Sequence, residues 1–493
     1  MLHLLPVPWG ERLSRRAMRR PHVALRMVRS TTPGSLEALG RKKALYAFHR
    51  AARRVPAYRD YLSARGVVAG HVRTYQQFVQ QVPETDKHHY VQPATLPQLC
   101  LDGSVAQADM LVRSSGFSGH PVIWARSHEE ETFARRMSTL GSELLFSILE
   151  VPTLIINCFA LGSWVSGVDV LKIADERCTI ISPGINQEEI LELVATLGPH
   201  YPQLVLVGSP PFVKDVVDAL PIGGHPDLHV VVGGEPITEE WRDHVSARTG
   251  GKVYSFFGAS DIGVMGINEN EQTLAIRRAC RKDMALREAV FQARDTLPML
   301  FQYDPARYHI TKGPDGLLFT TLGLDVMLPL IKYCLDDLGH VIPYSDMREL
   351  LSRRGLQVSR GIPFPFLVMA GRKSGTVSFY GSLIYPDNVS SAIEARVALA
   401  RVVTGRFKLY VTHDAHQNEV LAVDIQLKPK VATSKALDGQ FSKAIEQGLR
   451  DGNPDFAVDY ECLKQRRAPF LRVRVFTAGR YPYKEGIKAR HTI

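Results

Sequence analysis

The residues with the clearest chemical potential form a loop rich in serine and glycine. Its members are Ser114, Ser115, Gly116, Ser118 and Gly119. Glycine lets backbone N–H groups turn toward an anion, and serine hydroxyls add hydrogen-bond donors. Such a loop can cradle a polyphosphate, with Arg113 supplying charge beside it. It is not the lysine-containing phosphate loop GxxxxGK[ST], because His120 follows its last glycine, and an ordinary turn is the other interpretation.

A second set of residues could build the walls of a purine site. Two glycines end a run of valines, and farther along the chain an aromatic residue is followed by a glycine that leaves free space beside its ring. The set comprises Gly234, Glu235, Pro236, Phe257, Gly258 and Ser260. Asp261 adds a carboxylate for a hard cation such as Mg²⁺. Taken singly, each piece is also consistent with a turn, a core aromatic residue or a helix cap.

A third candidate is Asp337, which ends the stretch Pro-Leu-Ile-Lys-Tyr-Cys-Leu-Asp-Asp that begins at Pro329. A carboxylate placed after a buried strand can accept two hydrogen bonds from the hydroxyl groups of a ribose. An aspartate in a simple turn is the alternative.

Alternating strands and helices must position these residues. Short β-branched or apolar runs predict strands at 153–156, 204–207, 230–232 and 317–320, and helical patterns fall at 188–197, 211–220 and 238–249. This alternation predicts an α/β fold whose sheets are covered by helices. Before it, 35–65 reads as a helix that Pro56 interrupts, and the capping box from Ser127 to Glu130 predicts another helix start.

The pattern changes near Gly371 and Arg372, after which strands alternate with a helix at 436–449 and a strand follows at 470–476. About 120 residues suffice for a small α+β domain. The predicted organisation is a basic arm at 1–34, a large domain at 35–370 and a small domain at 371–493.

Composition excludes several classes of protein. The chain has 493 residues, of which 45% are hydrophobic and 22% charged, which is ordinary for globular proteins. No apolar run is long enough to span a membrane, and six scattered cysteines argue against a disulfide framework. We therefore expect a cytoplasmic protein with no transmembrane segment.

The net charge of +10 is concentrated at the N-terminus, since residues 1–60 hold 14 Lys or Arg and 3 Asp or Glu. The first interpretation is a partly helical arm that packs on the body. Contact with an anionic membrane or nucleic acid, and a targeting segment that is removed, are the alternatives. Without interleaved aromatic residues, no nucleic-acid partner is expected.

Taken in order, these motifs resemble the adenylate-forming superfamily, in the branch of phenylacetate–CoA ligase and its capsule-biosynthesis relatives. The order is the specific part of the resemblance, which covers about 45–493. The motifs that carry it are Ser115–Pro121, Gly233–Pro236, Phe257–Asp261, Lys332–Asp337, Gly371-Arg372 with Gly381 and Pro386, Val55–Arg59 and Val82–Lys87.

The resemblance implies a large multi-sheet α/β domain and a small mobile α+β lid. ATP and a carboxylic acid would give an acyl-adenylate and pyrophosphate, and a thiol, such as that of coenzyme A, or an amine would then take the acyl group. The serine- and glycine-rich loop would hold the phosphates, Gly234–Pro236 and Phe257 the adenine, Asp261 the Mg²⁺, and Asp337 with Arg372 the ribose. The acid pocket would include Phe159, Gly162, Trp164, Ser209 and Pro210.

The chain departs from the family's pattern at several positions. Phe117 and His120 stand where threonine and lysine are usual, Phe257 replaces a tyrosine, Asp261 a glutamate, Leu335-Asp336 a Thr-Gly pair, and Ser374 the hinge carboxylate. The C-terminal catalytic lysine is favoured at Lys488, with Lys484 as the alternative and a basic tail without a catalytic role as the third interpretation.

Three hypotheses for function remain open. The first is adenylation of an aromatic or otherwise apolar acid, followed by transfer to a thiol or an amine. The second is activation of a non-carboxylate such as nitrite for N–N bond formation on an aryl amine. The third is a nucleotide-binding relative without turnover. The oligomeric state is left open, with a homodimer as one option.

Overall fold

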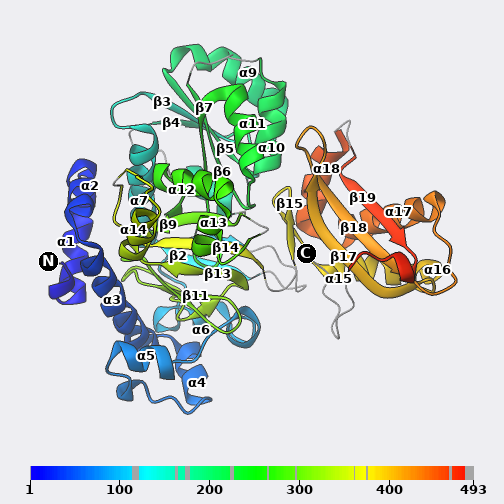
Figure 1. Cartoon of the computed structure of the whole chain (residues 1–493). Coiled ribbons are helices and arrows are strands. Elements are labelled where there is room, and N and C mark those ends of the chain that lie inside the picture. The colour runs from blue at the N-terminus through cyan, green and yellow to red at the C-terminus, as the bar shows by residue number, and fades with distance from the viewer. Residues whose placement is uncertain are drawn as a thin grey trace. The chain divides into compact units, whose positions relative to one another are not determined.

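The protein is described by a computed structural model (Figure 1). The described residues are 2–113, 122–161, 165–171, 178–221, 227–263, 266–294, 297–359, 361–372, 376–465 and 469–483. The chain forms two compact units. The larger contains Met1–Ser114, Val122–Gly208 and Val216–Gly371, and the smaller contains Ser115–Pro121, Ser209–Asp215 and Arg372–Ile493.

A nine-stranded sheet forms the centre of the larger unit, in the order β13-β14-β9-β8-β7-β6-β5-β3-β4. Its strands are β3 (Thr153–Asn157), β4 (Thr179–Ile181), β5 (Gln203–Gly208), β6 (Leu228–Gly233), β7 (Gly250–Phe256), β8 (Ile267–Asn268), β9 (Met299–Tyr303), β13 (Asp337–Ile342) and β14 (Phe366–Arg372). The five strands β4-β3-β5-β6-β7 run parallel, and β8 and β9 pair in the antiparallel sense. Strands β3 and β5 are buried along their whole length, as expected for parallel strands covered on both faces. The predicted α/β class is confirmed.

Helices connect these strands and lie along them (Figure 1). They are α8 (Val165–Leu171), α9 (Gln187–Leu197), α10 (Pro210–Ala219), α11 (Glu239–Thr249), α12 (Glu271–Lys282), α13 (Met284–Phe291) and α14 (Tyr344–Arg353). Polar side chains cap the first turns of two of them, since Thr238 accepts a hydrogen bond from the Trp241 N–H, and Asn186 accepts one from the Glu189 N–H. The predicted helices at 188–197 and 238–249 therefore begin and end within a residue or two of the observed ones.

Smaller elements complete the larger unit. Strands β1 (Ala108–Arg113) and β2 (Ile123–Ser127) form a hairpin, while β10 (Tyr308–Lys312), β11 (Leu317–Thr321) and β12 (Tyr333–Cys334) form a three-stranded sheet. The predicted helix at 35–65 is divided at Pro56 into α3 (Pro33–Arg54) and α4 (Pro56–Ser63). This part also contains α5 (Tyr75–Gln81), α6 (Leu96–Leu99) and α7 (His128–Phe146). The Ser127 side chain caps α7 by accepting a hydrogen bond from the Glu130 N–H.

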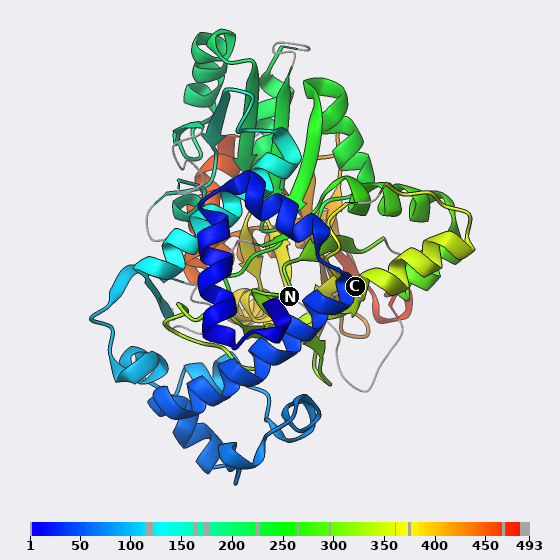
Figure 2. The ribbon, with the colours of Figure 1, turned by 90° about the vertical axis from the view of Figure 1, so that its left-hand side faces the viewer.

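The basic N-terminal arm is helical and packs on the larger unit. It forms α1 (Val7–Met18) and α2 (Pro21–Ser30), seen in blue in Figure 2. Arg15 reaches the buried carboxylate of Asp325 at 3.2 Å, and Lys43 of α3 pairs with Glu11 of α1 at 2.8 Å with both side chains buried. Apolar residues of α2 pack against Leu140 of α7. These contacts agree with the first interpretation of the arm, a partly helical segment that packs on the body.

One pH effect arises between α5 and β10, where the Tyr75 hydroxyl and His309 Nε2 lie 2.9 Å apart. Burial, with a smaller contribution from Arg41, lowers the pKa of His309 to about 4. In the unfolded chain His309 takes up a proton near pH 6.5, whereas in the folded chain it does so only near pH 4. Acid therefore favours unfolding between these two pH values. Between pH 7 and pH 5 we expect His309 to remove about 1–2 kcal/mol from the free energy of unfolding.

Urea unfolding of wild type and His309→Gln at the two pH values measures this effect. The variant should lose less stability on acidification than wild type by that amount. An identical pH dependence in the two proteins would show that His309 titrates normally.

The smaller unit has its own hydrophobic core. A three-stranded sheet of order β17-β18-β19 packs with helices around buried residues such as Phe441, Ile445 and Phe456. Its elements are β15 (Val377–Phe379), β16 (Ser382–Ile384), α15 (Pro386–Glu394), α16 (Val397–Ala400), β17 (Val403–His413), β18 (Glu419–Leu427), α17 (Lys435–Gly452), α18 (Pro454–Gln465) and β19 (Leu471–Phe476). This is the α+β composition predicted for the C-terminal part.

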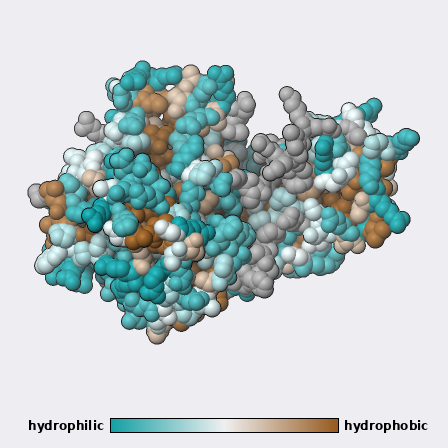
Figure 3. Space-filling view, turned by 90° about the horizontal axis from the view of Figure 1, so that it is seen from below, coloured by the Kyte–Doolittle hydropathy of each residue, from teal (hydrophilic) through white to brown (hydrophobic). Residues whose placement is uncertain are grey.

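Within the described ranges, each helix is too short or too polar to cross a lipid bilayer. On the face seen from below, hydrophobic residues form small patches between hydrophilic ones (Figure 3).

Candidate functional site

The centre of the candidate site is the edge of the sheet where β6 and β7 end. Gly233 and Phe256 are paired in register, so the residues that follow both strands emerge side by side. In open α/β sheets, ligands bind outside the carboxyl ends of parallel strands. Gly234 has φ +93°, which favours glycine, and a Cβ on Gly233 would lie 2.4 Å from the Phe256 ring. Gly234 is therefore favoured by its backbone conformation and Gly233 by the space that the Phe256 ring occupies.

The residues after β6 differ in exposure. Glu235 is buried, whereas Gly234 and Pro236 are exposed. The exposed backbone of these two residues is the part that a bound purine could contact.

Phe257 lies beside them, directly after β7. Its ring is half-buried and nearly parallel to the Phe319 ring, with centroids 6.1 Å apart and an interplanar angle of 24°. Its backbone N–H donates to the carbonyl of Ile267 at 3.0 Å. Strand β11 thus fixes the orientation of the aromatic ring predicted to stack on a base.

Asp261 is held in a tight turn, in which the Gly263 N–H donates to the Ala259 carbonyl at 2.8 Å. Gly258 precedes this turn and Ser260 lies within it. The Tyr333 hydroxyl donates to Asp261 Oδ2 at 2.6 Å. Burial, together with the negative charge of Asp261, raises the pKa of Tyr333 well above its usual value, so the phenol remains a donor at neutral pH.

A single carboxylate fits a magnesium ion that arrives with a nucleotide. Among the described residues no group of three or more His, Cys, Asp or Glu side chains could hold a metal ion. Mg²⁺ is commonly bound by one or two carboxylates while substrate phosphates and water supply its other ligands. Asp261 supplies one such carboxylate, and its side chain is only partly buried.

Asp337 is buried and is the first residue of β13. The chain reaches it through Lys332 and Asp336, which both have left-handed backbone conformations. The Lys332 ammonium group donates to the carbonyls of Val79 and Val82 at 3.0 and 2.7 Å. These two hydrogen bonds hold the stretch that precedes Asp337 against the C-terminal end of α5.

The segment 82–87, one of the N-terminal marks of the resemblance, pairs with the same stretch. The Thr85 N–H donates to the Lys332 carbonyl at 3.0 Å, and the Cys334 N–H donates to the Thr85 carbonyl at 2.8 Å. Two motifs about 250 residues apart therefore form one backbone ladder that leads from Tyr333 toward Asp337.

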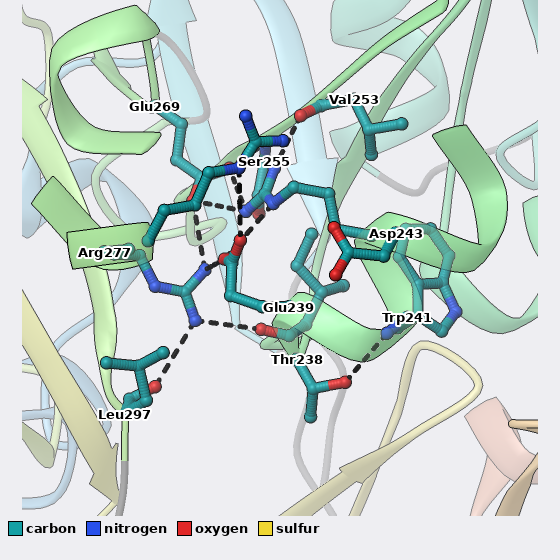
Figure 4. Close-up of polar contacts among 12 residues, drawn as sticks. Thr238, Glu239, Trp241, Asp243, Val253, Ser255, Glu269, Arg277 and Leu297 are labelled. Carbon is teal, nitrogen blue, oxygen red and sulfur yellow. Dashed lines mark hydrogen bonds and ion pairs between the residues drawn. The ribbon is translucent and has the colours of Figure 1, made fainter. Parts of the chain in front are cut away.

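A buried cluster of four charges lies behind the loop that follows β6 (Figure 4). Arg242 donates two hydrogen bonds to the Glu269 carboxylate, at 2.7 and 2.9 Å. Arg277 lies 2.7 Å from Glu239 and 3.3 Å from Glu269. All four side chains are at most 1% exposed, so the charges are neutralised within the cluster.

The cluster also binds the backbone on both sides of the candidate site. Arg277 donates to the carbonyl of Ile237, the residue after Pro236, at 3.1 Å. Glu269 accepts the Ser255 N–H of β7 at 2.7 Å. It therefore fixes the loop after β6 relative to the end of β7, where Phe257 begins.

The predicted acid-binding residues are only partly described. Phe159 follows β3, and its ring lies 6.2 Å from that of Phe256 in an edge-to-face arrangement. Ser209 and Pro210 follow β5 directly. Gly162 and Trp164 lie outside the described residues.

Several other predicted residues also lie outside the described ranges. They are Ser114, Ser115, Gly116, Ser118, Gly119, Ser374, Lys484 and Lys488. Arg372 is described as the last residue of β14. The phosphate loop and the catalytic lysine therefore stay predictions from the resemblance.

Sequence reasoning missed the four-charge cluster and the hydrogen bond from Tyr333 to Asp261. The Glu239 and Arg242 pair has the three-residue spacing of neighbours on a helix, which is a weak signal. Nothing in the local pattern links either residue to Glu269 or Arg277, because the sheet topology brings them together.

Comparisons with known proteins relate this arrangement to one fold. No protein-family model matches the sequence, and no curated protein matches it. The solved structure of 2-hydroxyisobutyryl-CoA ligase in complex with 2-HIB-AMP and CoA, in the thioesterification state, is similar with a TM-score of 0.63 and 14% identity, covering 92% of this chain and 88% of that chain. An open conformation of that ligase has a TM-score of 0.52 at 14% identity, with 93% of this chain and 91% of that chain covered. At this identity the likeness shows that the chain shares the fold of that ligase.

Proposed function

We propose that the protein is an AMP-forming ligase, which uses ATP to adenylate a carboxylic acid and then transfers the acyl group to a thiol. The observation that carries this proposal is the paired ends of β6 and β7. They bring Gly234–Pro236 next to Phe257 at the ligand-binding edge of a parallel sheet. The shared fold with a ligase whose structure holds 2-HIB-AMP and CoA supports the same reaction class.

The reaction solves a general chemical problem. A carboxylate is a poor electrophile, because its leaving group would be oxide. Attack of its oxygen on the α-phosphorus of ATP forms a mixed anhydride with AMP and releases pyrophosphate. A thiolate then attacks the acyl carbon, the thioester bond forms and AMP leaves.

The described residues would bind and orient the nucleotide for this step. The backbone at Gly234–Pro236 and the Phe257 ring would hold the adenine, and Asp337 would accept hydrogen bonds from the ribose. Asp261 would bind the Mg²⁺ that accompanies ATP and offsets phosphate charge. The resemblance assigns the phosphates to the serine- and glycine-rich loop, the ribose also to Arg372, and the catalytic role to Lys488 or Lys484. Membership in the phenylacetate–CoA ligase branch is likewise proposed from the resemblance.

The acid is proposed to be apolar or aromatic, because Phe159 and Phe256 present rings at the ends of β3 and β7. The acceptor is proposed to be coenzyme A. An amine is the alternative acceptor.

ATP–pyrophosphate exchange over a panel of aromatic, fatty and hydroxy acids tests the proposal. We expect Mg²⁺-dependent exchange with at least one apolar acid and none without an acid. ATP binding without exchange for any acid would contradict adenylation and favour a binding protein without turnover. AMP release that requires nitrite and an aryl amine, and ignores the acids, would favour the diazotising alternative.

Replacing Phe257 with leucine tests the purine site. Leucine keeps the apolar contact with Phe319 but removes the ring, and stacking on a base is worth about 1–3 kcal/mol. We expect the Kd for ATP to rise about tenfold, measured by calorimetry. The control is Phe470→Leu, which changes a half-buried phenylalanine that packs on the core of the smaller unit. Equal effects of the two replacements would remove Phe257 from the nucleotide site.

A further inference from the structure

A cavity lies in the larger unit, between the N-terminal helices and α7. Its volume is about 870 Å³, within the range of roughly 300–1,000 Å³ that small-molecule sites occupy. Figure 2 shows the three helices α1, α2 and α3 that frame this part of the unit. None of the described residues assigned above to the nucleotide or the acid lines it.

The body of the cavity is apolar. Its side chains come from α1, α2, α3 and α7 and include Met18, Leu25, Leu39, Met137, Leu140 and Leu144. Methionine adapts its shape to irregular ligands more readily than branched side chains do. A wall of this composition suits an alkyl or ring-shaped apolar body.

One end of the cavity is polar, and most of its groups are already paired. Gln302 accepts a hydrogen bond from the Asn270 side chain at 2.7 Å and donates to the carbonyls of Ile362 and Phe364. Gln272 donates through Nε2 to the Ser359 carbonyl at 2.7 Å. That carbonyl requires a donor, so the orientation of the Gln272 amide is fixed.

The remaining oxygen, Gln272 Oε1, has no hydrogen-bond partner in the described part of the chain, although the side chain is only 3% exposed. A buried acceptor without a partner costs free energy, so a donor is expected to reach it. A Cβ on Gly361 would lie 2.7 Å from this oxygen, so a residue with a side chain at this position would clash with the Gln272 amide.

We propose that this cavity binds an apolar small molecule carrying one hydrogen-bond donor, of the class of long-chain alcohols and amides. The apolar body lies among the residues of α1, α2, α3 and α7, and its hydroxyl or N–H group donates to Gln272 Oε1. The site is separate from the proposed adenylation reaction and does not depend on it.

Calorimetric titration with decan-1-ol, octan-1-ol and 1-methoxydecane tests the proposal on the full chain. Decan-1-ol is expected to bind about tenfold more tightly than octan-1-ol, because two more methylene groups are buried. It is also expected to bind at least fivefold more tightly than 1-methoxydecane, which has no donor. Equal binding of the alcohol and the ether would mean that water satisfies Gln272, and would overturn the proposed contact.

A glycine in α7 provides a variant that fills the cavity. A Cβ on Gly141 would meet only Asn268 Nδ2, at 3.9 Å, and leucine favours a helix more than glycine does. Gly141→Leu should therefore fold and bind decan-1-ol at least tenfold more weakly than wild type. The matched control is Gly439→Leu in the exposed first turns of α17, where a Cβ has nothing within 4 Å.

A thermal melt verifies that each variant is folded. If Gly141→Leu does not fold, Met137→Trp is the second variant that fills the same cavity. Loss of binding in the filled variant alone supports the proposal. Unchanged binding in the folded variant, or no binding of decan-1-ol to wild type, would overturn it. Neither result bears on pyrophosphate exchange, so the two proposals fail independently.

Discussion

Replacing Asp337 with asparagine is expected to lower kcat/KM for ATP about 30- to 1,000-fold, mainly through a higher KM. The proposed site gives its carboxylate two charge-assisted hydrogen bonds to the ribose, each worth about 1.5–3 kcal/mol. Asparagine keeps the size of the side chain and one acceptor oxygen but loses the charge. Pyrophosphate exchange at varied ATP concentration measures the change.

The neighbouring residue supplies a matched control. Asp336 is exposed and has φ +65°, a conformation that asparagine also tolerates. Asp336→Asn removes the same charge one residue away and should leave kcat/KM for ATP within about threefold of wild type. If both variants lose activity equally, Asp337 does not contact the nucleotide.

Replacing Glu269 with leucine is expected to have the largest effect on stability. The change leaves Arg242 and Arg277 buried next to each other, and removes the acceptor of the Ser255 N–H. Removing one partner from a buried ion pair costs about 3–5 kcal/mol. Urea unfolding followed by circular dichroism should show this decrease in the free energy of unfolding.

An exposed ion pair of the same helices serves as the control. Arg281 and Glu240 lie 2.9 Å apart, with side chains 39% and 55% exposed. Glu240→Leu should change the free energy of unfolding by less than about 1 kcal/mol. Similar costs for the two variants would mean that the four-charge cluster contributes no more than a surface pair.

The local pattern of the sequence predicted those elements whose signals are short-range. The valine-rich run at 230–232 and the helix that Thr238 caps appear as β6 and α11. Pro56 separates α3 from α4, as its missing N–H requires. The candidate nucleotide residues were found because strand ends and glycines have local signatures.

Long-range features could not be predicted in the same way. The order of the nine strands, the ladder between Thr85 and Lys332, and the contact of Tyr333 with Asp261 join residues that are distant along the chain. The N-terminal arm was interpreted from its charge, whereas its apolar residues, among them Met18 and Leu25, line the cavity between the N-terminal helices and α7. Charge and periodicity describe one helix face at a time, so neither shows what two faces enclose.

The measurement that tests the central claim most directly is a crystal structure of the full chain with Mg²⁺ and the α,β-methylene analogue of ATP. The account predicts adenine between Gly234–Pro236 and the Phe257 ring, ribose hydroxyls within hydrogen-bond distance of Asp337, and Mg²⁺ on Asp261. A nucleotide bound away from the carboxyl ends of β6 and β7, with Asp337 and Asp261 more than 8 Å from it, would contradict the account.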